Sequence, residues 1–100
     1  MEIPKIKLED GKGYKDWIKE NEMEFWDMTI QAIKVLSDNP DLDYYTAFIL
    51  HGGNLKEEEK DFIVKRKKIV STLNKGLKTM ESKEEYEMCS IIVELKEKFK

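Results

Sequence analysis

Hydrophobic residues recur with the period of a helix over residues 14–38. At about 100° per residue they share one broad face, and a polar strip that includes Glu20, Glu24 and Asp27 lies opposite. In the second half of this segment the apolar arc covers more than half of the helix surface. Such an arc is typical of a helix that packs against neighbours on several sides. We therefore predict one long helix at the centre of the fold.

Asn21 marks a place where this helix could break. Glu24 stands three residues later, and the spacing resembles a capping box, in which two side chains satisfy free N–H groups at a helix start. In that alternative, residues 14–20 form a separate turn.

The next segment, residues 40–51, lies between two groups of residues that often delimit helices. Asn39-Pro40 provides an N-cap followed by proline at the first helical position, and Gly52-Gly53 provides a C-cap and a turn. These signals predict a second helix over 40–51. Because Tyr44 to Leu50 is rich in β-forming residues, a strand over 44–50 is the alternative.

A third helix is predicted over residues 55–75. Asn54 and Glu57 have capping-box spacing, apolar residues at positions such as 62, 69 and 73 share a face, and Gly76 follows as a C-cap.

The fourth helix is predicted over residues 83–99, where Ser82 and Glu85 again have capping-box spacing. The short connection across residues 76–82 predicts that the third and fourth helices form an antiparallel hairpin.

Residues 1–13 have the pattern of an extended arm. Pro4 opposes a helix start, apolar residues alternate after it, and two glycines end the segment. The predicted fold is therefore all-α, a small four-helix domain preceded by an extended N-terminal arm. The alternative is an α+β fold with short strands near residues 5–9 and 44–50.

Composition indicates one small domain with strongly segregated charge. The chain has 100 residues and a net charge of −3. Residues 16–43 carry eight acids against two lysines, whereas residues 60–78 carry seven bases against one acid. Cys89 is the only cysteine, and no leader pattern or membrane-length apolar run is present, so we expect a cytoplasmic protein.

Arg66 is the only arginine and lies within the run Lys65-Arg66-Lys67-Lys68. On a helix over 55–75 its side chain would face the apolar stripe, together with that of Glu59. Three interpretations follow: the charge reaches solvent at the rim, it pairs with Glu22 or Glu59, or it contacts a partner. The ion-pair interpretation predicts that Arg66→Lys destabilises the protein more than Lys67→Ala.

The basic segment 60–78 raises the possibility of nucleic-acid binding. The predicted helices around Gly52-Gly53 even have the outline of a helix-turn-helix, but the start of its second helix would be the acidic run Glu57-Glu58-Glu59, which repels phosphates. On a helix, these acids and the later lysines are explained by the helix dipole. Nucleic-acid binding through this basic face therefore stays the alternative function.

No pattern of catalytic or metal-binding residues is present. His51 is the only histidine, no nucleophile or paired ligand has suitable spacing, and no glycine-rich phosphate loop occurs. We interpret His51 as a residue that interacts with the dipole at a helix C-terminus, and Cys89 as a small core residue. We expect no cofactor, no metal and no enzymatic activity.

The function predicted from the sequence is that of a small, acidic, non-enzymatic protein-interaction module. It would act as an adaptor or inhibitor of the kind found among phage and mobile-element accessory proteins, binding another protein and possessing surface for a homodimer. Nucleic acid is a less favoured partner, and a membrane is not expected. The predicted partner-binding residues are Arg66, Lys65, Lys67, Lys68, Glu20, Glu24 and Asp27.

Overall fold

The computed structural model describes residues 3–99, which form an α+β domain with a three-stranded sheet. The all-α prediction is wrong, and the α+β alternative is supported. The first two residues of the predicted arm lie outside the described part. The elements are β1 (Lys5–Leu8), α1 (Tyr14–Glu20), α2 (Glu22–Asp38), β2 (Tyr44–Gly52), η1 (Gly53–Leu55), β3 (Glu59–Lys65), η2 (Arg66–Lys68), α3 (Ile69–Ser82) and α4 (Tyr86–Lys98).

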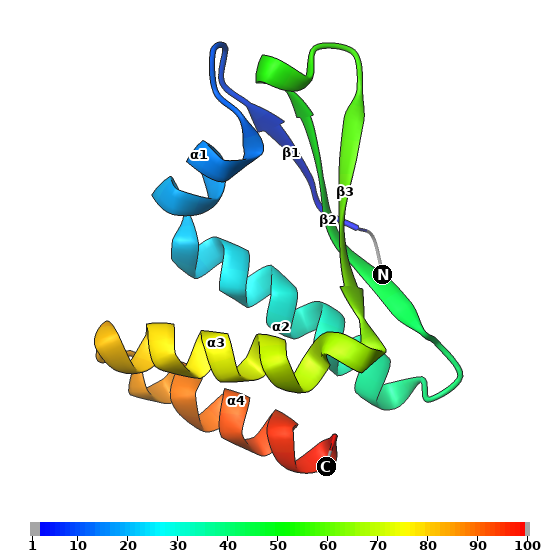
Figure 1. Cartoon of the computed structure of the whole chain (residues 1–100), viewed down its shortest axis with the longest axis vertical. Helices are drawn as coiled ribbons and strands as arrows, with labels where there is room; N and C mark the ends of the chain where they lie inside the picture. Colours follow the sequence, from blue (N-terminus) through cyan, green and yellow to red (C-terminus); the bar gives the residue numbers. More distant parts are fainter. Residues whose placement is uncertain (1–2, 100) are drawn as a thin grey trace.

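The sheet has the order β1-β2-β3, with β1 parallel to β2 and β2 antiparallel to β3. Helices α1 and α2 connect the two parallel strands. In Figure 1 the sheet stands on the right, α2 crosses the centre diagonally, and α3 and α4 lie below as an antiparallel pair. Within residues 3–99, helices therefore cover one face of the sheet and none covers the other.

Residues 44–52 form a strand because the residue types at their centre outweigh the signals at their ends. Aromatic and β-branched side chains fill β2, and these pack well on a pleated surface. Asn39 ends α2 instead of starting a helix, because its side-chain amide donates to the Val35 carbonyl at 2.8 Å. Pro40 then lies in a turn closed by the Leu42 N–H and the Asn39 carbonyl. The predicted helix over 40–51 is therefore wrong.

The predicted helix over 55–75 is also wrong in its first half. Residues 59–65 alternate, with Phe62 and Val64 on the inner face of the sheet and their neighbours on the outer face. The Phe62 ring stacks on that of Phe48 in β2, with centroids 4.9 Å apart and planes 6° apart. This cross-strand contact favours a strand over a helix. The helix begins only at Ile69.

Asn21 does break the first predicted helix, as in the alternative interpretation. Its backbone N–H and its side-chain amide both donate to the Trp17 carbonyl, which closes α1, and α2 begins at the next residue. α2 then packs between the sheet and the C-terminal helices. Its buried residues are Trp26, Thr29, Ile30, Ala32, Ile33 and Leu36.

The C-terminal hairpin is present, but its loop is shifted. α3 continues through Gly76 to Ser82, so neither residue has the predicted capping role, and α4 begins at Tyr86. Gly76 lies against the ring of Trp26, where an added Cβ would stand 2.9 Å from the nearest ring carbon. The glycine is therefore a close-packing residue. None of the helices within residues 3–99 combines the length and apolarity needed to cross a bilayer.

Candidate functional site

Among the described residues, Arg66 has no carboxylate partner, and its guanidinium is bound by three backbone carbonyls. Its Nε donates to Leu42 at 2.7 Å, and one terminal nitrogen donates to Leu36 at 2.7 Å and to Asn39 at 2.8 Å. The Leu36 carbonyl belongs to the last turn of α2, where carbonyls lack intrahelical partners and attract a positive charge. Arg66 thus joins the end of β3 to the α2–β2 connection.

The two carboxylates proposed as partners of Arg66 lie elsewhere. Glu22 pairs with Lys83 at 3.4 Å, and Glu59 pairs with Lys5 at 3.3 Å across the outer face of the sheet. The ion-pair interpretation of Arg66 is therefore wrong. The guanidinium presents a planar fork of N–H donors, and this fork binds main-chain oxygens of the same chain.

An open groove with a cavity volume of about 640 Å³ lies between α1 and α3. We call it the α1–α3 groove, and it is lined by Lys15, Ile18, Lys19, Glu22, Phe25, Trp26, Lys75, Lys78 and Thr79. Its floor is apolar, because Ile18, Phe25 and Trp26 form it. Phe25 and Trp26 meet edge to face, with centroids 5.2 Å apart, so the floor is a fixed aromatic corner.

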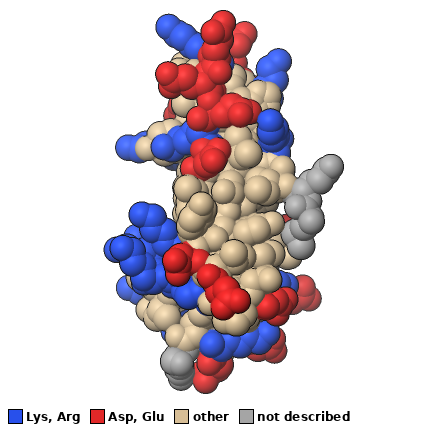
Figure 2. Space-filling model, turned by 90° about the vertical axis from the view of Figure 1, so that its right-hand side faces the viewer, with Lys and Arg blue, Asp and Glu red and all other residues tan. Residues whose placement is uncertain are grey.

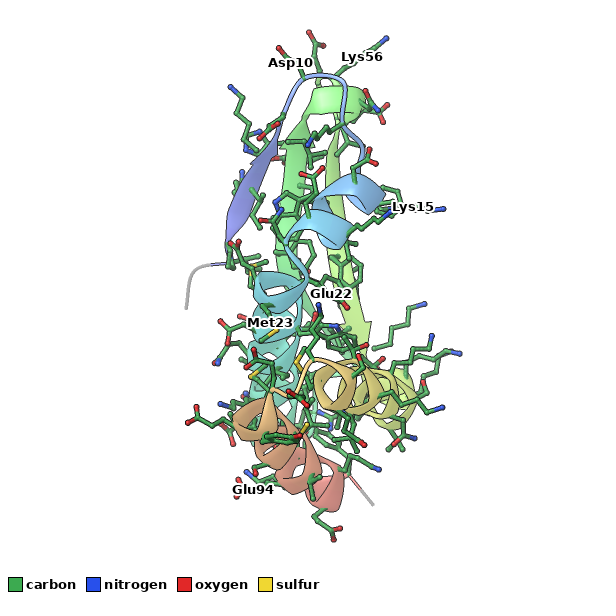
Figure 3. The ribbon with its side chains drawn as sticks, turned by 90° about the vertical axis from the view of Figure 1, so that its left-hand side faces the viewer. Asp10, Lys15, Glu22, Met23, Lys56 and Glu94 are labelled. Carbon is green, nitrogen blue, oxygen red and sulfur yellow. The ribbon has the colours of Figure 1, made fainter. Side chains whose placement is uncertain are left out.

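Four lysines form the rim of this groove, two from α1 and two from α3. In the part of the chain that the structure describes, none of the four forms an ion pair. The only acid of the lining, Glu22, is paired with Lys83. Figure 3 shows Lys15 directed to the same side of the molecule as the nitrogen-tipped side chains around α3. The groove therefore joins an apolar floor to an excess of positive charge.

A second cavity, of about 440 Å³, continues from the first between β3 and α3. This β3–α3 groove shares Phe25, Trp26 and Lys75 with its neighbour and adds the ring of Phe62. Its remaining lining consists of Thr29, Ile63, Val64, Lys65, Lys68 and Thr72. Lysines thus follow the aromatic floor from α1 to the edge of the sheet.

The structure separates the other predicted partner-binding residues. Lys67 lies outside both grooves, beside Lys65 and Arg66 in a cavity of about 490 Å³. Glu20 accepts hydrogen bonds from Lys12 at 2.6 and 2.8 Å, and this contact raises the pKa of Lys12 above its usual value.

The two acids predicted on the long helix also lie apart from the grooves. Asp27 lines a cavity of about 210 Å³ beside Pro4 and Tyr45, and Glu24 is exposed on α2. The predicted acidic strip is thus divided between two helices and does not form one surface.

His51 and Cys89 do not form a site. His51 is half-buried on β2, between Lys7 of β1 and Glu59 of β3 in the register, so its predicted place at a helix end is wrong. Cys89 packs beside the core and is half-buried. Within residues 3–99 no group of three His, Cys, Asp or Glu residues could hold a metal ion.

Lys15 and Lys19 are the groove residues that the sequence prediction missed. They stand four residues apart with Ile18 beside them, so they share one face of a helix, and this spacing was the available signal. Their approach to Lys75 and Lys78 depends on the position of α3, which no local pattern determines. Comparison of the chain with family models, with curated proteins and with solved structures finds no match.

Proposed function

We propose that this protein is a non-enzymatic interaction module that binds an acidic, amphipathic segment of a partner protein in the α1–α3 groove. The observation that supports the proposal is an aromatic floor surrounded by four lysines that form no ion pair with any described residue. An adaptor or inhibitor that acts by binding needs no catalytic group. We also propose a cytoplasmic location, because a lone cysteine cannot form an internal disulfide.

The floor would supply most of the affinity. Ile18 and Phe25 are only partly buried, and Trp26 lies behind them with 8 % of its surface exposed. An apolar anchor side chain that packs on this corner would be transferred from water onto aromatic rings that are already fixed in place. Amphipathic helices commonly bind in grooves of this kind by three or four anchor residues on one face.

The rim would select the partner by charge. Lys15, Lys19, Lys75 and Lys78 surround the floor, so acidic residues flanking the anchors would find complementary charge on both walls. Such pairs at the rim contribute mainly to specificity and to the association rate, and salt screens them. A basic or neutral segment would leave the four lysines uncompensated.

A synthetic peptide tests the proposal directly. The probe is an acidic amphipathic helix of about 15 residues with leucine anchors, and its binding is measured by calorimetry at low and high salt. We expect binding that weakens at least about tenfold in the double variant Lys75→Glu/Lys78→Glu. The control variant Lys7→Glu/Lys34→Glu carries the same charge change outside the groove and should bind as the original protein does. Unchanged binding by the groove variant would reject the site.

Single-stranded nucleic acid is the second candidate partner. The β3–α3 groove places Lys65, Lys68 and Lys75 around aromatic rings, and this arrangement suits a phosphate backbone with a stacked base. An oligothymidine added in the same experiment distinguishes the two. Salt-dependent binding of the oligonucleotide without binding of the peptide would favour nucleic acid and would reject the protein partner.

A further inference from the structure

We propose that two copies of this chain pair through the free edges of β3, antiparallel and about a two-fold axis at Ile63, to form one six-stranded sheet. The contact uses the edge and the outer face of the sheet. It does not involve the α1–α3 groove, and it stands whether or not that groove binds a peptide. It does share Ile63 and Lys65 with the lining of the β3–α3 groove.

The edge of β3 is open for this pairing. β3 is the last strand in the order β1-β2-β3, so only one of its sides faces β2. Among the described residues, no backbone hydrogen bond joins Glu59–Lys65 to a segment other than β2. Seven residues of regular strand with unpaired N–H and C=O groups on one side are a template for another strand.

The charges around β3 match each other when the strand is turned end to end. The acidic run Glu57-Glu58-Glu59 leads into β3, whose first residue is Glu59. The basic run Lys65-Arg66-Lys67-Lys68 starts at the last residue of β3 and continues beyond it. The helix-dipole explanation of these runs no longer applies, because residues 59–65 are a strand. Antiparallel pairing centred on Ile63 provides another explanation, since it places each acidic run against the basic run of the second copy.

One cross-strand pair shows this complementarity at the level of single residues. With Ile63 opposite itself, Asp61 lies opposite Lys65 of the second copy, and by symmetry this pair occurs twice. Lys60 lies opposite Arg66, whose guanidinium is already bound by three carbonyls of its own chain. Opposite charges placed directly across two strands stabilise them, whereas like charges destabilise them. An in-register parallel arrangement would put acids against acids and lysines against lysines.

The outer face beside this edge is apolar at its centre. Ile63 is 43 % exposed and Tyr44 is 58 % exposed, and the two lie on the same face as Ile49. Figure 2 shows an uncharged band across the middle of this face, with side chains of both charges above and below it and a basic cluster at the lower left. Pairing of two copies would bring their Ile63 side chains together and make the uncharged bands of the two copies continuous.

The surface area of the chain agrees with a covered face. The accessible surface is 6827 Å², whereas a compact monomer of 11.9 kDa exposes about 5,950 Å². The difference, about 900 Å², reflects the elongated shape of the chain, whose extents are 40 × 34 × 20 Å, and it leaves room for an interface of standard size, roughly 800 Å² on each partner. The radius of gyration of 14.0 Å also exceeds the roughly 12.7 Å expected for a compact chain of this length.

Sedimentation equilibrium across dilution, at about 50 mM and about 500 mM salt, tests the pairing. We expect a reversible dimer whose dissociation constant rises with salt. Asp61→Lys alone and Lys65→Asp alone place like charges opposite each other twice, so each should weaken the dimer at least about tenfold. The double variant Asp61→Lys/Lys65→Asp restores opposite charges in exchanged positions and should restore the dimer. A monomer at every concentration, or a double variant that associates more weakly than both single variants, would overturn the proposal.

A second pair of variants tests the position of the axis. Ile63→Lys places two charges against each other at the axis and should abolish the dimer. Val93→Lys makes the same change on α4, at a residue that is 47 % exposed, and should leave it intact. Circular dichroism checks that both variants fold. A dimer that persists in Ile63→Lys, or that is lost only in Val93→Lys, would show that the copies meet elsewhere.

Discussion

The two faces of the sheet are built from the same strands but have different surroundings. On the inner face, Phe48 and Leu50 are fully buried beneath the helices. On the outer face, Ile49 is half-buried and Ile63 is 43 % exposed. In Figure 1 the described helices lie on the opposite side of the sheet. Stability is therefore expected to depend on the inner face. The outer face and its free edge are available for contacts with other chains.

The charges follow the same division. Lysines on the inner side surround the α1–α3 groove, whereas the outer side carries acids and bases together, as in the pair of Lys5 and Glu59. One side is suited to a partner of opposite charge. The other side is suited to a surface of mixed charge, such as a second copy of itself.

Phe48→Ala should have the largest effect on stability. The ring is fully buried and contacts the rings of Trp17, Phe25 and Phe62, with centroids 4.9 to 5.9 Å apart. Its loss should lower the free energy of unfolding by about 3–5 kcal/mol in a denaturant titration. Tyr44→Ala removes an aromatic ring from the outer face and should lower it by less than about 1 kcal/mol. Equal effects would remove the distinction between the faces.

Arg66→Ala should lower the free energy of unfolding by about 2–3 kcal/mol, because three carbonyls lose a charged donor. Arg66→Lys should have an intermediate effect, since an ammonium cannot reproduce the planar fork. Lys67→Ala, one residue away and exposed, should change it by about 0.5 kcal/mol or less. If Arg66→Ala and Lys67→Ala unfold at the same denaturant concentration, the carbonyl contacts contribute nothing.

Gly76→Ala tests the packing of α3 on α2. Alanine favours a helix by about 1 kcal/mol over glycine, but its Cβ would stand 2.9 to 3.3 Å from three carbons of the Trp26 ring. We expect a net destabilisation of about 1–2 kcal/mol with a change in tryptophan fluorescence. A more stable protein with unchanged fluorescence would mean that the ring moves aside freely.

Ile63→Thr should have the smallest effect on the isolated chain. The side chain is 43 % exposed on an edge strand, so a β-branched polar residue should lower the free energy of unfolding by about 0.5 kcal/mol or less in dilute solution. The same variant should weaken self-association. A large loss of stability in the monomer would place Ile63 in the core of the fold.

The helical segments were the part of the fold that the sequence predicted well. The period of residues 14–38 indicates α2, because helix signals are local, and the break at Asn21 was the alternative to one long helix. The capping box expected there does not form, since the Asn21 side chain donates to the Trp17 carbonyl and closes α1. Helices were wrongly predicted over residues 40–51 and 55–75, because Asn39-Pro40 and Gly52-Gly53 can lie at the ends of helices and of strands alike. The β-forming residues of 44–50 gave a local signal for the strand alternative, whereas the pairing of Phe48 with Phe62, which is not local, extends the sheet to residues 59–65.

The candidate grooves were predictable only in part. Lys65, Lys68, Lys75 and Lys78 belong to the basic segment that the sequence singles out. Their common surface with α1 depends on how two helices far apart in the sequence approach each other. Arg66 was correctly identified as unusual, but its partners are carbonyl oxygens, which every residue carries and no sequence pattern marks.

The three carbonyl contacts of Arg66 have a consequence for local opening. Its guanidinium binds Leu36 and Asn39, 30 and 27 residues earlier, and its own N–H donates to Asp43 at 2.7 Å. The last turn of α2 therefore loses its cap whenever the β2–β3 hairpin separates. Most helix ends fray alone, but this one is expected to exchange its amide hydrogens with solvent together with the hairpin, as one cooperative unit.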